Sequence, residues 1–200
     1  MAQALYRHWF VDFGPFQDRE FKETEELGPI PKRWNPRALD SFFSVKTGKK
    51  NASAAVEDGD YPFFTCAQSV SRIDEWVYDE DSILLAGNGN FNVKWYRGKF
   101  DAYQRTYILT PENPKLLGVL YFAMKHHLDD LTIGHQGTVI QYLTKSMIAD
   151  YVVSWPPEEV LERIIPKFQS IISMVEHNRE ESRTLAETRD YLLPKLISGE

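Results

Sequence analysis

The sequence predicts an α+β protein: a mixed globular domain of strands and short helices, followed by one long C-terminal helix of the coiled-coil type. Through the middle of the chain, short runs of aromatic and β-branched residues alternate with Gly, Asn, Asp and Pro, a pattern typical of strands and turns. From Leu161 onward, apolar residues recur every three or four positions, the period of a helix packed on a neighbouring surface. We therefore divide the chain into a helical segment (1–16), a globular domain (17–155) and a terminal helix (156–200).

The first segment is expected to begin as an amphipathic helix within Ala2 to Phe16. Leu5, Trp9 and Phe13 share one face of such a helix, with two further aromatic residues beside them. Gly14-Pro15 is expected to end it. An acidic connector follows over 18–26, and three prolines between Leu27 and Leu39 predict an extended segment rather than a helix.

The globular middle is predicted to contain six strands and one helix. Leu116 to Leu128 places its apolar residues on one side of a helix. Turns are expected at Gly48, Asp58-Gly59, the Gly87 to Asn90 run, Gly98 and Pro111 to Pro114. The predicted strands are Phe63 to Cys66, Trp76 to Tyr78, Ser82 to Ala86, Val93 to Tyr96, Tyr103 to Leu109 and Ile148 to Ser154.

The terminal helix is predicted to begin at Glu158-Glu159, where carboxylates favour the positive end of a helix. Pro166 predicts a kink, or a short helix followed by a longer one. Packing on the chain's own domain is the common reason for apolar periodicity, but the length and the polar interruptions favour a helix that leaves the globule and pairs with a second helix. The positions assigned to this partner helix seam are Leu161, Ile164, Phe168, Ile171, Val175, Leu185 and Leu192.

Composition excludes several classes of protein. The 200 residues, 42% hydrophobic and 26% charged, describe one ordinary globular domain with an appendage. No apolar run approaches the ~20 residues that a membrane span needs, and the N-terminus has no signal pattern. One cysteine suits a reducing compartment, so we expect a cytoplasmic protein that no membrane anchors. The net charge of −6 comes from both flanks, because residues 30–155 are neutral.

Catalytic patterns are weak. The stretch Ser154 to Pro157 lacks the Asn or Asp and the aromatic residue of an amino-methyltransferase motif, and the spacing of Asp12, Glu20 and Lys22 is a permissive match to a nuclease site. His126, His127, Asp129 and His135 could be metal ligands, but adjacent histidines diverge on a helix. Cys66, beside strand residues, is expected in the core. We therefore predict no catalytic residues, no metal and no cofactor.

Five polar loops carry side chains suited to nucleic acid. Arg and Lys can pair with guanine, Asn and Gln can pair with adenine, and Lys or Arg can contact phosphates. Taken singly, each loop is more commonly an ordinary solvated turn than a binding loop. The candidate DNA-binding residues are Lys46, Lys49, Lys50, Asn51, Gln68, Ser69, Arg72, Asn88, Asn90, Asn92, Lys94, Tyr103, Arg105, His135, Gln136 and Thr138. Among them, Gln68, Asn90, Asn92, Arg105 and Gln136 are the predicted base readers.

Both ends of the chain resemble one known family. LAETRDYLLPKLISGE (Leu185 to Glu200) resembles the distal conserved region of specificity subunits of Type I restriction–modification enzymes, and ALYRHWFVDFGPF (Ala4 to Phe16) resembles the end of their central conserved region. ELGPIPKRW (Glu26 to Trp34) is similar to the start of a target recognition domain. The middle, with YPFFTCAQSVSRIDEW, SILLAGNGNFNVKWY and VVSWPPEEVLERI, fits the body of such a domain.

The resemblance implies a non-catalytic, sequence-specific DNA-recognition subunit. Such subunits hold double-stranded DNA through recognition domains, bind methyltransferase (modification) subunits around a helical spacer, and are joined by a motor-nuclease (restriction) subunit for cleavage. The common form has two recognition domains, and this chain has one. It therefore resembles either a half-subunit that works with a second copy or the C-terminal half of a longer chain, paired through antiparallel helices.

Two other functions compete with this interpretation. A helix-mediated protein-interaction adaptor without DNA recognition is favoured by the net acidity. A small metal-dependent hydrolase would use the histidines, but no coherent acid–base or metal set supports it. The loops rich in Asn, Gln and Arg favour DNA.

Overall fold

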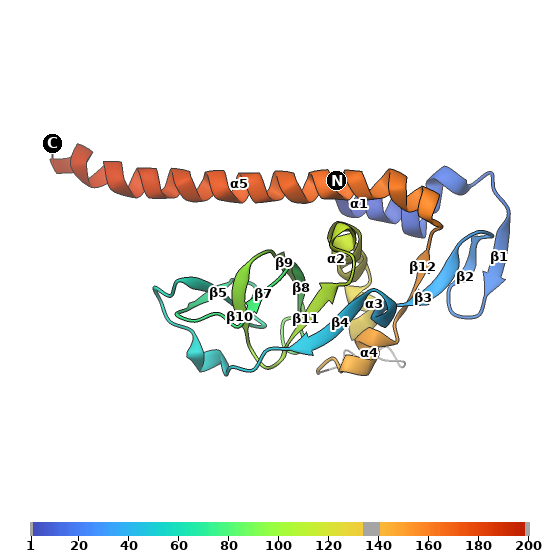
Figure 1. Ribbon diagram of the computed structural model, residues 1–200, viewed down its shortest axis with the longest axis horizontal. Coiled ribbons are helices and arrows are strands. Elements are labelled where there is room, and N and C mark those ends of the chain that lie inside the picture. Colours follow the sequence, from blue (N-terminus) through green and yellow to red (C-terminus); the bar gives the residue numbers. More distant parts are fainter. Residues whose placement is uncertain (1, 134–140, 199–200) are drawn as a thin grey trace.

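A computed structural model of the chain describes residues 2–133 and 141–198. It contains a mixed body from which one long helix extends (Figure 1). This arrangement confirms the predicted α+β class. The helices are α1 (Ala2–Tyr6), a π-turn (Arg7–Val11), α2 (Leu117–His126), α3 (Leu128–Thr132), α4 (Lys145–Ala149) and α5 (Glu158–Ser198), with short 3-10 turns at Gly14–Phe16, Leu39–Ser41, Ala52–Ala54 and Pro114–Leu116.

In the part of the chain that the structure describes, the strands form four small sheets. The central sheet has the order β4-β11-β8-β9 and a second sheet has the order β6-β5-β10-β7, while β1 pairs with β2 and β12 with β3. The bounds are β1 (Phe21–Thr24), β2 (Gly28–Pro31), β3 (Asn35–Ala38), β4 (Phe43–Thr47), β5 (Tyr61–Phe64), β6 (Ser71–Ile73), β7 (Tyr78–Asp79), β8 (Ser82–Ala86), β9 (Val93–Tyr96), β10 (Lys99–Ala102), β11 (Thr106–Pro111) and β12 (Val152–Trp155).

The central sheet is buried on both faces. Ile83 and Leu85 of β8 belong to the main hydrophobic core, which also contains most of α2. Leu84, which points to the opposite face of the same strand, joins Phe100 of β10 in a second, smaller core. Burial on both sides explains why β8 is apolar from Ile83 to Ala86, and its bounds agree with the predicted strand Ser82 to Ala86.

Several predicted elements differ in the structure. The acidic connector instead contains β1, which pairs with β2, whereas the segment from Leu27 to Leu39 is extended as predicted and contains β2 and β3. The predicted strand over Ile148 to Ser154 is wrong in its first part, because the Thr144 side chain accepts a hydrogen bond from the Met147 amide and caps α4. The strands β4, β6 and β10 were missed. β10 pairs in parallel with β5, far away in sequence, so local pattern gives little indication of it.

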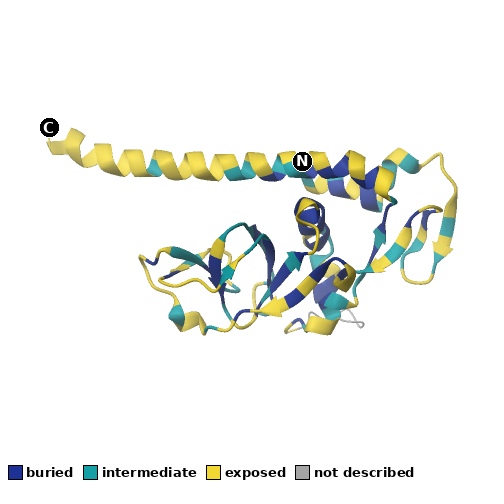
Figure 2. Cartoon of the chain, in the orientation of Figure 1, coloured by how far each residue is buried: buried dark blue, intermediate teal, exposed yellow. Residues whose placement is uncertain are grey.

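Helix α5 begins at Glu158 as predicted and runs for 41 residues without a break. The predicted interruption at Pro166 is absent. Pro166 lies on an exposed face of the helix, where water can satisfy the carbonyl left without a partner one turn earlier. Figure 2 shows buried residues near the start of α5 and mostly exposed residues toward its C-terminal end. Within the described residues, neither α5 nor any other helix is long and apolar enough to cross a membrane.

The first half of the predicted partner seam belongs to the chain's own core. Leu161, Ile164 and Phe168 are at most 5% exposed and pack in the main core with α2 and the N-terminal aromatic residues. Ile171 and Val175 are partly buried against the same core. The chain's own core, rather than a partner helix, therefore covers Leu161, Ile164 and Phe168, and this core includes the first part of α5. Leu185 and Leu192 remain 63% and 44% exposed.

Candidate nucleic-acid interface

Four polar loops meet at one end of the central sheet. Thr47 at the end of β4 and Ala86 at the end of β8 flank the beginning of β11, because both strands run antiparallel to it. The segments 48–51, 87–92 and 103–105 therefore emerge together. The loop 65–70 joins them, since β5 ends beside the end of β10. We call these four segments the loop face.

The loop face lies away from helix α5. The end of β11 leads to the 3-10 turn Pro114–Leu116 and then to α2, and both of these elements contact α5. The beginning of β11, with the four loops, is therefore at the remote end of the sheet (Figure 1). A ligand bound at the loop face would therefore not contact the long helix.

Backbone hydrogen bonds tie three of the four loops together, and the Asn92 side chain joins the fourth by donating to the Cys66 carbonyl at 2.9 Å. The Gly87 amide donates to the Arg105 carbonyl at 2.8 Å, and the Gln104 amide donates to the Lys50 carbonyl at 3.0 Å. A side chain at Gly87 would bring its Cβ to within 2.5 Å of the Arg105 carbonyl, so this close approach requires glycine. The loop face is thus one connected surface rather than four independent turns.

The loop face differs in charge from the rest of the chain. Its four segments contain Lys49, Lys50 and Arg105 but no Asp or Glu, although the chain has 29 acidic residues and a net charge of −6. Lys50 lies 3.8 Å from Glu75. A local excess of positive charge on an acidic protein favours the binding of a polyanion at that place.

Most of the predicted DNA-binding residues lie on this face. Those that are exposed or partly exposed there are Lys49, Lys50, Asn51, Gln68, Ser69, Asn88, Asn90, Tyr103 and Arg105. His135, Gln136 and Thr138 lie outside the described residues. Tyr142, which the sequence did not indicate, forms a strand-like bridge with Asn88 and is 56% exposed. Its position beside the loop face comes from a contact between residues far apart in sequence, which leaves no local signature.

Four predicted DNA-binding residues are engaged within the protein. Lys46 forms an ion pair with Glu80 at 3.1 Å. Arg72 donates to the Gly59 and Asp60 carbonyls at 2.8 and 2.7 Å. Asn92 is 7% exposed and donates to two backbone carbonyls. Lys94 donates to the Ala67 carbonyl at 2.6 Å, and burial lowers the pKa of its amine. The contacts of Asn92 and Lys94 join the loops 65–70 and 87–92, and they engage the amide of Asn92, which the sequence predicts as a base reader.

The histidines considered as metal ligands take part in packing contacts. His127 accepts or donates a hydrogen bond with Tyr151 at 3.0 Å and lies 3.4 Å from Asp130. His126 packs against the ring of Tyr6. Over residues 2–133 and 141–198, no three His, Cys, Asp or Glu side chains are grouped so that they could hold a metal ion.

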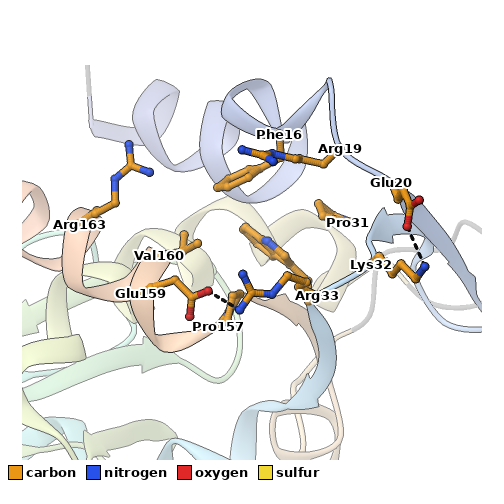
Figure 3. Close-up of a pocket in the computed structure, with 11 residues that line it drawn as sticks. Phe16, Arg19, Glu20, Pro31, Lys32, Arg33, Pro157, Glu159, Val160 and Arg163 are labelled. Atoms are coloured by element: carbon orange, nitrogen blue, oxygen red, sulfur yellow. Dashed lines mark hydrogen bonds and ion pairs between the residues drawn. The ribbon is translucent and has the colours of Figure 1, made fainter.

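A pocket of about 450 Å³ lies at the junction of the N-terminal segment, the β1–β2 hairpin and the start of α5 (Figure 3). Lys32 pairs with Glu20 at 2.7 Å, and Arg33 pairs with Glu159. Trp34, Phe16 and Val160 supply apolar lining. This pocket shares no residue with the loop face.

The comparison with family models identifies the class of protein. The model described as Type I restriction modification DNA specificity domain matches residues 31–185. Since the match covers most of the sequence, the chain belongs to this family of specificity domains. It includes all four segments of the loop face and the part of α5 that packs on the globular body.

Particular relatives agree with this family. The chain is 40% identical over 152 residues to the Type I restriction enzyme EcoDI specificity subunit of Escherichia coli, covering 76% of this chain and 34% of the relative. It is 27% identical to the MjaIX specificity subunit of Methanocaldococcus jannaschii, covering all of this chain and 52% of that relative. The chain therefore spans about a third to a half of the length of these curated relatives.

Solved structures share the fold. The S subunit of a Type I restriction–modification system from M. genitalium has a TM-score of 0.65 at 20% identity, with 84% of this chain and 46% of that chain covered. The HsdS subunit from Thermoanaerobacter tengcongensis has a TM-score of 0.52 at 13% identity, with 90% and 44% covered. At this level of identity, the likeness concerns the arrangement of strands and the long helix.

Proposed function

We propose that this chain is a target recognition module of a Type I restriction–modification specificity subunit, which binds double-stranded DNA by sequence through its loop face. The observation that carries the proposal is the convergence of four loops with three basic and no acidic residues. Lys49, Lys50 and Arg105 would contact phosphates, and the exposed amide side chains would contact base edges. The module itself performs no catalysis and directs methyltransferase and nuclease subunits to their site.

We propose that the distal part of α5 pairs with another helix, from a second copy or from another part of a longer chain. Met174 and the residues Leu185, Tyr191, Leu192, Leu193, Leu196 and Ile197 are exposed. The terminal five of these form an apolar group on a helix end that extends beyond the globular body (Figure 2). Apolar surface of this kind is typical of a protein interface.

The experiment that tests the function combines the chain with its cognate methyltransferase subunit. Methylation should protect one defined set of sequences in a mixed pool of duplexes. The same methyltransferase with a chain in which Lys49 and Arg105 are changed to Glu should protect far fewer sites. Assembly with the methyltransferase but no sequence preference in the protected set would instead support the adaptor function.

A further inference from the structure

Two exposed carboxamides on the loop face are joined to each other. Gln68 Nε2 donates a hydrogen bond to Asn90 Oδ1 at 3.3 Å. Gln68 belongs to the loop after β5 and Asn90 to the β8–β9 hairpin, so the contact links two separate segments. Gly89, immediately before Asn90, has a φ of +67°. Glycine adopts this left-handed conformation without strain and so permits the tight turn that presents Asn90.

A set of internal contacts holds the two loops in register. Asn92 Nδ2 donates to the Cys66 carbonyl at 2.9 Å and to the Asn90 carbonyl at 2.7 Å. Lys94 Nζ donates to the Ala67 carbonyl at 2.6 Å and also contacts Asn92 Oδ1. Asn92 therefore contacts the backbone of both loops, and its burial leaves it little freedom to move. The relative position of Gln68 and Asn90 is fixed before any ligand arrives.

The chemistry of the pair matches one base. A hydrogen bond between two carboxamides uses one N–H and one carbonyl oxygen, so an amide N–H of Asn90 and the carbonyl oxygen of Gln68 remain free. Rotating both amides exchanges the two roles but still leaves one donor and one acceptor. In the major groove, adenine presents the N7 acceptor beside the N6 donor, whereas guanine presents two acceptors.

We infer that Gln68 and Asn90 act together as one reader of an adenine in the major groove, and that Asn92 is a positioning residue for this reader. The inference rests on the proposed function and deepens it, because it assigns a base to a particular pair of side chains. Neither amide needs to rearrange when the base arrives, since their mutual hydrogen bond already sets their spacing.

The test uses the full chain bound to its methyltransferase subunit and a random-sequence duplex library. Selection of bound duplexes by the wild-type complex should give a consensus with a required adenine. Gln68→Ala and Asn90→Ala should each reduce the preference for adenine at that one position by about five- to 150-fold, the range for loss of a bidentate base contact. Gln17→Ala changes the same residue type at an exposed position outside the loop face and should leave that preference intact.

Modified bases make the assignment specific. A duplex with 7-deazaadenine at the required position lacks the N7 acceptor, and the wild-type complex should bind it more weakly than the adenine duplex. Both single variants should bind the two duplexes equally. The double variant should lose no more preference than either single variant, because breaking either half of one reader disables the whole.

Asn92→Asp tests the positioning role. It keeps an acceptor for Lys94 but removes both N–H donors that contact the loops. The adenine preference should fall, while the preferences at other positions and the melting temperature of the complex change little. A uniform loss of affinity at every position would show that Asn92 only maintains the fold, and would overturn its positioning role.

The outcomes separate the inference from the function. If the complex selects a defined sequence but the two single variants keep the wild-type consensus and the wild-type response to 7-deazaadenine, the paired reader is overturned while DNA recognition stands. Additive losses in the double variant would also overturn it, since they indicate two independent contacts. If the wild-type complex selects no sequence, both proposals fail.

Discussion

His127 lies where the N-terminal helix meets the globular body. Its ring is within 3.4 Å of the Tyr6 hydroxyl through Nε2 and 3.0 Å of the Tyr151 hydroxyl through Nδ1. Burial lowers the pKa of His127 below its usual value of 6.5, and neighbouring His126 acts in the same direction, while the carboxylate of Asp130 opposes it. The folded protein therefore favours the neutral imidazole.

This shift predicts a loss of stability in mild acid. Above pH 6.5 the ring is neutral in both states, so His127 adds no pH dependence. As the pH falls below 6.5, the unfolded chain takes up a proton that the folded chain resists, and the free energy of unfolding should fall by at most about 1.4 kcal/mol per pH unit. Urea denaturation at pH 7.5 and 5.5 measures the difference in the free energy of unfolding between the two pH values. His127→Gln should show a smaller difference between the two pH values; an equal difference would assign the effect to other groups.

Among elements, the contact between α2 and α5 is unusually close. A Cβ placed on Gly118 of α2 would lie 2.9 Å from Phe168 Cβ and 3.2 Å from the Phe168 carbonyl of α5. Phe168 and Ile172 are at most 1% exposed at this crossing. Because Gly118 has no side chain, the backbones of α2 and α5 can pack closely, and Phe168 and Ile172 are buried between them.

We predict that Gly118→Ala destabilises the protein by about 1–3 kcal/mol, the typical cost of an overpacked core. Alanine is a better helix former than glycine by roughly 1 kcal/mol, so propensity alone predicts stabilisation. Urea denaturation of the wild type and the variant shows whether the free energy of unfolding falls, as overpacking predicts, or rises, as helix propensity predicts. Lys125→Ala, on the exposed side of α2, is the control and should change stability by less than about 0.5 kcal/mol.

Helix α5 has a docked part and a free part. Arg97 joins Asp81 at 3.1 Å and Glu176 of α5 at 3.2 Å, and the Arg179 guanidinium lies 4.7 Å from the centre of the Trp95 ring. Beyond Arg179, every described residue of α5 except Ala186 is exposed. The polar contacts around Arg97 thus set the direction in which the free part leaves the body.

The free part can therefore be changed without disturbing the fold. Leu192→Asp with Leu196→Asp should abolish any association through this helix, because pairing would bury two charges, while the melting temperature of the monomer stays unchanged. Sedimentation velocity and circular dichroism measure the two effects.

The double variant Ile171→Asp with Val175→Asp is a different case, because both residues pack on the main core. It should lower the melting temperature. Unchanged association of the Leu192 and Leu196 variant would place the interface elsewhere.

At the scale of the whole molecule, charge is separated from one end to the other. The flanking segments 1–29 and 156–200 carry the net negative charge, whereas the charged side chains of the loop face are all positive. Because the loop face and α5 lie at opposite ends of the central sheet, the acidic helix is held away from the surface proposed for DNA. Few cations are available to neutralise phosphates, so the isolated chain should bind DNA weakly.

This arrangement predicts a shallow dependence of DNA affinity on salt. Lys49→Glu should weaken binding to all duplexes by a similar factor and reduce the slope of log affinity against log salt by about one unit. Fluorescence anisotropy measures both effects on duplexes of different sequence. The salt concentration is varied from about 50 to about 300 mM, on the order of the range in which counterion release is measured. Lys115→Glu, exposed at the opposite end of the sheet, is the matched control and should change nothing. Equal effects of the two variants would show that net charge, rather than the loop face, controls binding.

Local sequence patterns were enough to predict the α+β class, the strands β8 and β9, the start of the long helix and the loops that carry polar side chains. These features depend on local patterns: an apolar run for β8, glycine and asparagine for the hairpin after it, and carboxylates at the first turn of α5. Family membership also followed from local motifs at both ends, and the family model confirms it.

The neighbours that each polar or apolar residue contacts are evident only from the three-dimensional fold. Asn90 and Asn92 are two positions apart in one polar loop, yet Asn90 is exposed and Asn92 is buried against the Cys66 carbonyl. Ile164 and Leu192 belong to the same heptad pattern, yet Ile164 is fully buried and Leu192 is 44% exposed. Periodicity shows that a face is apolar, but not whether the chain's own core or another helix covers it, because that depends on contacts between residues far apart in sequence.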